Sequence, residues 1–212
     1  MEASDSVLYD TFTHQLDCLY GQTNKVIGDC NRNMASITDY DLTFRPTRKH
    51  QDDTEYFDYA FKQKTLLDVK HTRRALWKAA DMVHRQDCRD VLQGVKKSEN
   101  SNTIALKFQI KGSSSTSLSE HIVVRRYDEE NRSILVWRSL TEGNGTLRGM
   151  HSDKTGWCVL RPFEFGGIKE TYVRQVPIYF TKTHDKQNIS DFIILTHQAN
   201  EEDGIAIAKA LA

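Results

Sequence analysis

Five successive segments between residues 104 and 181 alternate apolar and polar side chains, and short turn signals separate them. We predict strands near residues 104–110, 120–127, 132–141, 155–162 and 170–181. Alternation with a period of two is typical of half-buried strands. Turn residues at 128–131, 143–145 and 166–167 predict short connections, which favour an antiparallel meander. A run of strands this long restricts the chain to folds built on one antiparallel sheet.

Helical periodicity flanks the meander on both sides. We predict helical segments over residues 1–36, 68–86 and 187–212. Gly21 divides the first segment into two helices, Asp68 is the expected cap of the second, and Gly204 is a site for a kink in the third. Two further strands, near residues 39–45 and 57–61, are predicted to pair as a hairpin.

The order of these elements is helix, two strands, helix, several strands, helix, and it indicates an α+β fold. The start of the last segment, residues 189–195, also fits a strand. We expect a single domain over residues 1–212, because no stretch is a stronger linker than the short serine-rich loop at 112–117. Its parts are N-terminal helices at 1–36, a sheet with an inserted helix at 37–183, and a C-terminal helical segment at 187–212.

Charge and cysteine content narrow the class of protein. Lys plus Arg and Asp plus Glu both total 29, so the chain has no broad electrostatic footprint for nucleic acid. No apolar window approaches the length of a membrane span, and the N-terminus has no apolar signal region. The four cysteines form no CxxC pair, so we expect free thiols and a reducing intracellular compartment such as the cytoplasm. The histidines show no metal-ligand spacing, so neither a metal nor a cofactor is expected.

Two short motifs resemble catalytic sites only superficially. His151, Ser152 and Asp153 have the residue types of a hydrolase triad, but successive side chains point apart and cannot converge on one atom. Gly143 and Gly145 lack the Lys-Ser/Thr ending of a phosphate loop, so we interpret them as a hairpin turn. The sequence therefore names no acid–base pair, and we predict that the chain is not an enzyme.

Arginines recur inside the apolar strands of the meander. On the strand at 132–141, Arg138 shares one face with Ile134 and Val136, while Trp137 lies on the other face. A buried arginine needs a partner or water. Arg138 therefore either extends to the edge of the sheet or provides a polar anchor inside an apolar cavity, and the sequence leaves both open.

The meander resembles the START (steroidogenic acute regulatory-related lipid transfer) family. The matching segments are Glu120-His-Ile-Val-Val-Arg125, Leu147-Arg148-Gly149, Gly156-Trp-Cys-Val-Leu-Arg-Pro162 and Thr171-Tyr-Val-Arg174. Their order and spacing agree with the family over about sixty residues. The segment from Arg132 to Ser139 is also similar to START-like domains of oomycetes, some of which are known as mating-specific proteins.

This resemblance implies a helix-grip fold, in which a curved antiparallel sheet wraps around a long C-terminal helix. It also implies a tunnel for a lipid or other hydrophobic small molecule. Transient membrane contact is compatible with such a site, and the sequence does not identify a protein partner. The ligand-binding residues expected from the resemblance and the strand pattern are Arg125, Trp137, Arg138, Arg148, Trp157, Tyr172, Arg174 and Phe192. The C-terminal helix is expected to close the site.

Three functions stay open at this point. The first is noncatalytic binding of a hydrophobic ligand. The second is a protein-interaction domain whose cavity is filled by aromatic side chains, and the third is an enzyme of a related cyclase or hydrolase type. A cavity of about 300 Å³ or more would favour the first function over the second.

Overall fold

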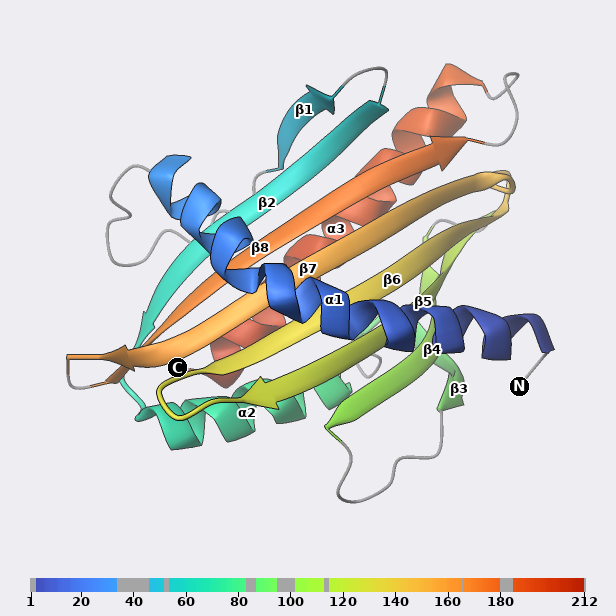
Figure 1. Ribbon diagram of the computed structural model, residues 1–212. Helices are drawn as coiled ribbons and strands as arrows, with labels where there is room; N and C mark the ends of the chain where they lie inside the picture. Colours follow the sequence, from blue (N-terminus) through green and yellow to red (C-terminus); the bar gives the residue numbers. More distant parts are fainter. Residues whose placement is uncertain are drawn as a thin grey trace.

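The computed structural model describes residues 3–33, 46–51, 54–82, 87–94, 102–112, 115–164, 166–179 and 185–211. The helices are α1 (Ala3–Asn33), α2 (Val69–Met82) and α3 (Lys186–Ala210). The strands are β1 (Thr47–Gln51), β2 (Thr54–Thr65), β3 (Arg89–Gly94), β4 (Thr103–Lys111), β5 (Thr116–Asp128), β6 (Ser133–Gly145), β7 (Met150–Phe163) and β8 (Gly166–Tyr179). Figure 1 shows their arrangement.

Within these residues, eight strands form one antiparallel sheet in the order β1-β2-β8-β7-β6-β5-β4-β3. From β3 to β8, each strand pairs with the next strand along the chain. β2 pairs with β8, so the first hairpin, β1-β2, is added beside the last strand. The sheet is curved, and the long helix α3 runs across one of its faces (Figure 1). The predicted α+β class and helix-grip arrangement are therefore confirmed.

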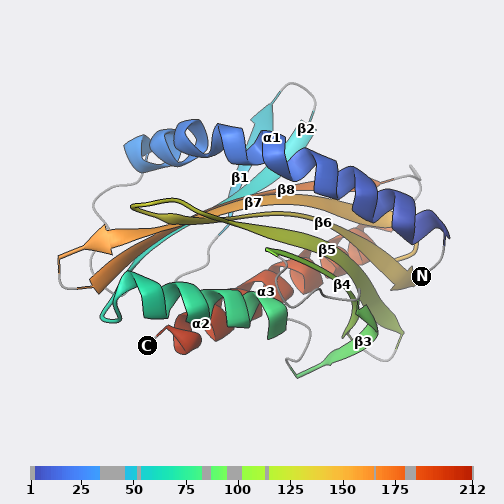
Figure 2. The same ribbon diagram turned by 60° about the horizontal axis from the view of Figure 1, so that its bottom comes forward.

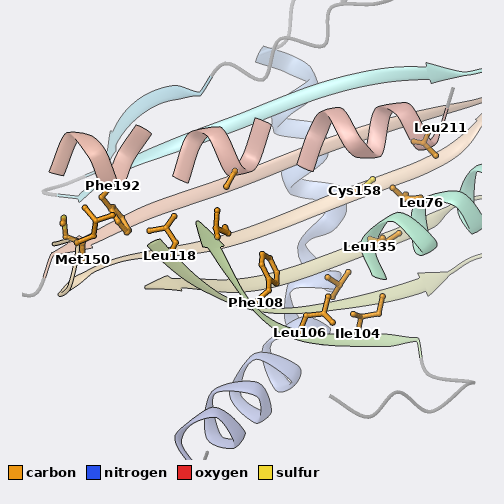
Figure 3. Close-up of a cluster of buried hydrophobic side chains, with 14 residues drawn as sticks. Leu76, Ile104, Leu106, Phe108, Leu118, Leu135, Met150, Cys158, Phe192 and Leu211 are labelled. Carbon is orange, nitrogen blue, oxygen red and sulfur yellow. The ribbon is translucent and has the colours of Figure 1, made fainter. Parts of the chain in front are cut away.

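The helices divide between the two faces of the sheet. α2 and α3 cover one face, which we call the inner face, and α1 covers the opposite, outer face (Figure 2). On the inner face, Phe192 of α3 and Leu76 of α2 belong to one apolar cluster with residues of the sheet such as Phe108 (Figure 3). On the outer face, Phe12 and Leu16 of α1 pack with Val136 and other sheet residues. Each face is thus buried under its own helices.

The N-terminal segment forms one helix, which corrects the prediction of two helices divided at Gly21. Gly21 is exposed and lies inside α1. The buried stripe passes it without a change of phase, because Leu16, Thr23 and Ile27 are separated by seven and four residues. Packing of this stripe on the outer face outweighs the intrinsic cost of one helical glycine, which is about 1 kcal/mol.

Several other element boundaries differ from the predicted ones. β3 was not predicted: Val91 and Leu92 are both exposed, and a register shift between Val91 and Gln93 removes the alternation that signals a strand. Gly166 and Gly167, expected in a turn, belong to β8. Gly204 lies inside α3, whose helix also includes residues 189–195. Close packing of α3 against the sheet holds these residues in a single helix.

Other predictions are confirmed or fall outside the described residues. Asp68 caps α2, because its Oδ1 accepts a hydrogen bond from the His71 backbone N–H at 2.9 Å. Residues 83–86 of the predicted helix and residues 34–45, which include the predicted strand at 39–45, lie outside the described part of the chain. Among the described helices, none is long and apolar enough to cross a membrane.

Candidate functional site

A cavity of about 130 Å³ lies between the inner face of the sheet and the helices α2 and α3. Most of its lining is apolar, and it includes Tyr59, Phe61, Leu76, Phe108, Trp137 and Ile207. Pockets for drug-sized ligands usually span about 300–1,000 Å³. The cavity therefore has the composition of a ligand site but is small in this conformation.

A buried ion pair forms one side of the cavity. Lys154 Nζ on β7 lies 2.8 Å from Glu120 Oε1 on β5, and both side chains are buried. The hydroxyl of Thr141 also donates a hydrogen bond to Glu120. Burial raises the pKa of Glu120, but the Lys154 ammonium and the hydrogen bonds to this carboxylate outweigh it and hold its pKa below the ordinary value. Glu120 is thus a carboxylate whose charge is already compensated.

A chain of polar side chains connects this pair to α3. Lys154 Nζ donates to Asn200 Oδ1 at 3.2 Å, and Asn200 Nδ2 donates to Gln175 Oε1 at 2.7 Å. Gln175 Nε2 in turn donates to Thr196 Oγ1 at 3.3 Å. Tyr59 on β2 donates its hydroxyl to Gln175 Oε1 at 3.0 Å. These bonds satisfy polar groups in the interior and fix α3 to the sheet.

A second ion pair lies where α3 passes the edge strand β3. Arg89 Nη1 lies 2.8 Å from Asp203 Oδ1, and Asp203 lines the cavity. Arg89 Nη2 also donates to the Ala199 carbonyl at 3.2 Å. The guanidinium of Arg89 stacks over Phe108, with 5.2 Å from its Cζ to the ring centroid. Asp203 is therefore paired with a fully buried cation.

Unlike the other charged residues that line the cavity, Lys169 on β8 has no oppositely charged partner among the described residues. Its side chain lines the cavity and the residue is 1% exposed. Among the described residues, its Nζ has no hydrogen-bond acceptor. The nearest aromatic contact is the ring of Phe61, whose centroid lies 4.9 Å from Nζ. Burial lowers the pKa of Lys169 to about 8, since desolvation penalises the charged form.

Five of the eight predicted site residues lie on the outer face, away from the cavity. These are Arg125, Arg138, Trp157, Tyr172 and Arg174. Arg125 Nη1 lies 2.9 Å from Asp17 Oδ1 of α1. Arg138 pairs with Asp153 at 2.7 Å, and its guanidinium lies over the ring of Phe12 of α1. These two arginines therefore bind α1 and the strands beneath it.

The aromatic residues in this set make similar structural contacts. Trp157 Nε1 donates to the Leu19 carbonyl of α1 at 2.9 Å. The Tyr172 hydroxyl donates to Asp58 Oδ1 at 2.6 Å, and the Arg174 guanidinium lies over the ring of Tyr56. Successive residues of a strand point to opposite faces of the sheet, and these three residues occupy positions that point to the outer face, where α1 packs.

The remaining three predicted residues are dispersed. Arg148 lies in the turn between β6 and β7, beside a shallow groove that it shares with Glu142 and His151. Phe192 is fully buried in the apolar cluster under α3 but does not line the cavity (Figure 3). Trp137 alone among the eight lines the cavity. The structure therefore does not bring the predicted set together.

Sequence reasoning missed Glu120, Lys154 and Lys169. Each is a charged residue on a strand position whose same-face neighbours are apolar or small, such as Thr171 and Val173 beside Lys169. The predicted site uses this pattern only for arginines. The sequence shows these charged residues among apolar or small neighbours, but it does not show which face of each strand lines the cavity.

Comparisons with known proteins give structural likenesses only. A scan of known protein families and a search of curated proteins both find no match for this sequence. Among solved structures, the human StarD13 (DLC2) lipid transfer and protein localization domain shares 10% identity, with a TM-score of 0.48, and the match covers 90% of this chain and 96% of that one.

Two further structures belong to proteins named as aromatase/cyclases. The di-domain protein BexL of the BE-7585A biosynthetic pathway shares 13% identity with a TM-score of 0.47, and the match covers 74% of this chain. This chain spans half of the BexL chain. ZhuI of Streptomyces sp. R1128 shares 5% identity with a TM-score of 0.47, and the match covers 73% of this chain and 93% of that one.

The prediction that this chain is not an enzyme needs correction, because two of the similar structures belong to proteins named as aromatase/cyclases. That prediction rested on the lack of an acid–base pair in the sequence. Proteins named for catalysis are among the structures with a similar arrangement of sheet and helices, so this fold gives no ground for excluding catalysis.

Proposed function

We propose that this protein binds a hydrophobic small molecule in the cavity between the inner face and the helices α2 and α3. The observation that carries the proposal is the apolar lining with a small number of polar groups directed into it. This combination is typical of small-molecule sites, where apolar contacts give affinity and the polar groups orient the ligand.

We further propose that α3 is the lid of this site. α3 contributes Asn200, Asp203, Gly204 and Ile207 to the lining. A ligand larger than about 130 Å³ requires α3 or α2 to move away from the sheet. Movement of α3 breaks the hydrogen bonds of Asn200 and Thr196 to Gln175, so these bonds hold the lid closed.

One observation favours a second candidate, a protein-interaction domain with a filled cavity. The volume of about 130 Å³ is below the range of pockets for drug-sized ligands. In such a domain the aromatic side chains would be core residues, and no small molecule would accompany the purified protein.

Two experiments separate these candidates. Native mass spectrometry of the purified protein, followed by organic extraction, should detect a copurifying hydrophobic molecule. Titration with a fluorescent fatty-acyl or sterol probe should then show saturable binding to one site. Binding of neither a copurifying molecule nor a probe would favour the filled cavity.

A matched pair of variants places the binding in this cavity. Ala80→Phe adds a ring to a residue of α2 that lines the cavity, and we expect it to abolish probe binding. Ala60→Phe adds the same ring at an exposed position of β2, and we expect it to leave binding unchanged. Equal binding by both variants would place the site elsewhere.

A further inference from the structure

The side chain of Lys169 is buried without a compensating charge. Its Nζ has no hydrogen-bond partner among the described residues, and the residue is 1% exposed, so it does not reach solvent. Gln63 lies opposite Lys169 on β2, and its Oε1 also lacks a partner. A neutral amide cannot supply a negative charge. An unpaired buried cation is costly, and proteins usually place a partner beside it.

The carboxylates of the cavity are already engaged by other cations. Glu120 is bound by Lys154 at 2.8 Å, and Asp203 by Arg89 at 2.8 Å. Arg89 does not itself line the cavity, but when it is counted with the charged residues of the described lining, three cations face two carboxylates, and Lys169 is the cation left without one. The site therefore has an N–H donor and a positive charge that no acceptor or carboxylate among the described residues engages.

We propose that the ligand carries a carboxylate, and that this group binds the Lys169 ammonium while the apolar part of the ligand fills the cavity. This inference rests on the proposed function and specifies the ligand as a hydrophobic carboxylic acid. A lysine–carboxylate hydrogen bond is charge-assisted and therefore among the stronger kinds. It would satisfy the Nζ that the protein leaves without a partner.

Protonation of Lys169 makes the binding dependent on pH. With a pKa of about 8, Lys169 is about nine-tenths charged at pH 7 and about one-tenth charged at pH 9. The other titratable groups of the lining are Tyr59 on β2, Glu120 on β5, Lys154 and Cys158 on β7, and Asp203 on α3. Burial raises the pKa values of Tyr59 and Cys158, which keeps both neutral.

The test compares two ligands of equal length, octanoate and 1-octanol, by isothermal titration calorimetry at pH 7. We expect the protein to bind octanoate at least about tenfold more tightly than 1-octanol, because only octanoate pairs with Lys169. Between pH 7 and pH 9 the octanoate affinity should fall by about tenfold, in proportion to the charged fraction of Lys169, while 1-octanol affinity stays constant.

Two variants assign the preference to this lysine. Lys169→Met keeps an unbranched apolar side chain and should remove the preference for octanoate, together with its dependence on pH. Its melting temperature should equal or exceed that of the unmodified protein, since a buried unpaired charge is removed. Lys78→Met removes the same charge from an exposed position of α2 and should keep the preference.

The outcomes separate this inference from the proposed function. Binding of 1-octanol without a preference for octanoate would overturn the proposal that the ligand carries a carboxylate, but it would still support binding of a hydrophobic molecule. A preference that survives in Lys169→Met would also overturn it, because another cation would then hold the acid. Binding of neither compound would overturn both proposals.

Discussion

The indole ring of Trp137 on β6 lies directly against Gly156, its register partner on β7. A Cβ atom at position 156 would lie 2.1 Å from the ring, a distance that no side chain can occupy. Gly156 therefore gives Trp137 the space to lie flat on the inner face and form part of the cavity wall.

Gly156→Ala should displace the Trp137 ring and destabilise the protein by about 1–3 kcal/mol, the usual cost of overpacking. Urea denaturation measures the change in unfolding free energy, and tryptophan fluorescence reports the displaced ring. The matched control is Gly28→Ala in α1, where nothing lies within 4 Å of the new Cβ. That change should stabilise the helix by up to about 1 kcal/mol. Equal effects of the two substitutions would contradict the contact.

Lys154→Met should destabilise the protein by about 3–5 kcal/mol, because it leaves the Glu120 carboxylate buried without its cation. The double variant Glu120→Gln with Lys154→Met should recover most of this loss, since no charge then remains unpaired. Both values come from urea denaturation at pH 7. A double variant as unstable as the single one would show that lost packing, and not the charge, causes the effect.

Glu120 should also contribute to acid unfolding. Its folded pKa lies below the ordinary value of about 4.5, so the stability from its charged form is complete above that pH. This stability is lost as pH falls from about 4.5 through the lower folded pKa. Melting temperatures between pH 3 and pH 7 should therefore decline less steeply in Glu120→Gln than in the unmodified protein. Parallel curves would contradict the lowered pKa.

Phe192→Ala should destabilise the protein by about 3–5 kcal/mol, because the ring is fully buried between α3 and the sheet (Figure 3). Ile194→Ala is the control on the same helix: Ile194 is 50% exposed, and its loss should change stability by less than about 1 kcal/mol. Thermal or urea denaturation distinguishes the two. Similar small losses would show that α3 contributes little to the fold.

Arg125→Ala should leave octanoate and probe binding unchanged, because Arg125 lies on the outer face and not in the cavity. Its effect on stability should stay within about 1 kcal/mol, since Asp17, its partner on α1, is 68% exposed. Calorimetric titration measures the binding and urea denaturation the stability. A large loss of affinity would support the role that the sequence resemblance implies for this arginine.

The strands from β4 to β8 and the cap of α2 at Asp68 were predictable because their signals are local. Alternation, turn residues and a capping side chain act over a few residues, so the sequence states them directly. β3 was missed because its two apolar residues are adjacent and exposed at the edge of the sheet. The division of α1 at Gly21 was wrong because burial of one face decides whether a helix continues.

The sequence by itself determined the α+β class, the antiparallel meander and the helical C-terminal segment, because periodicity and turn chemistry are properties of neighbouring residues. The tertiary structure alone decided which face of each strand is covered by α1 and which lines the cavity. Strand alternation defines two faces but does not say which helix covers each one. For that reason Arg125 and Arg138 were predicted in the site that Lys169, Glu120 and Lys154 occupy.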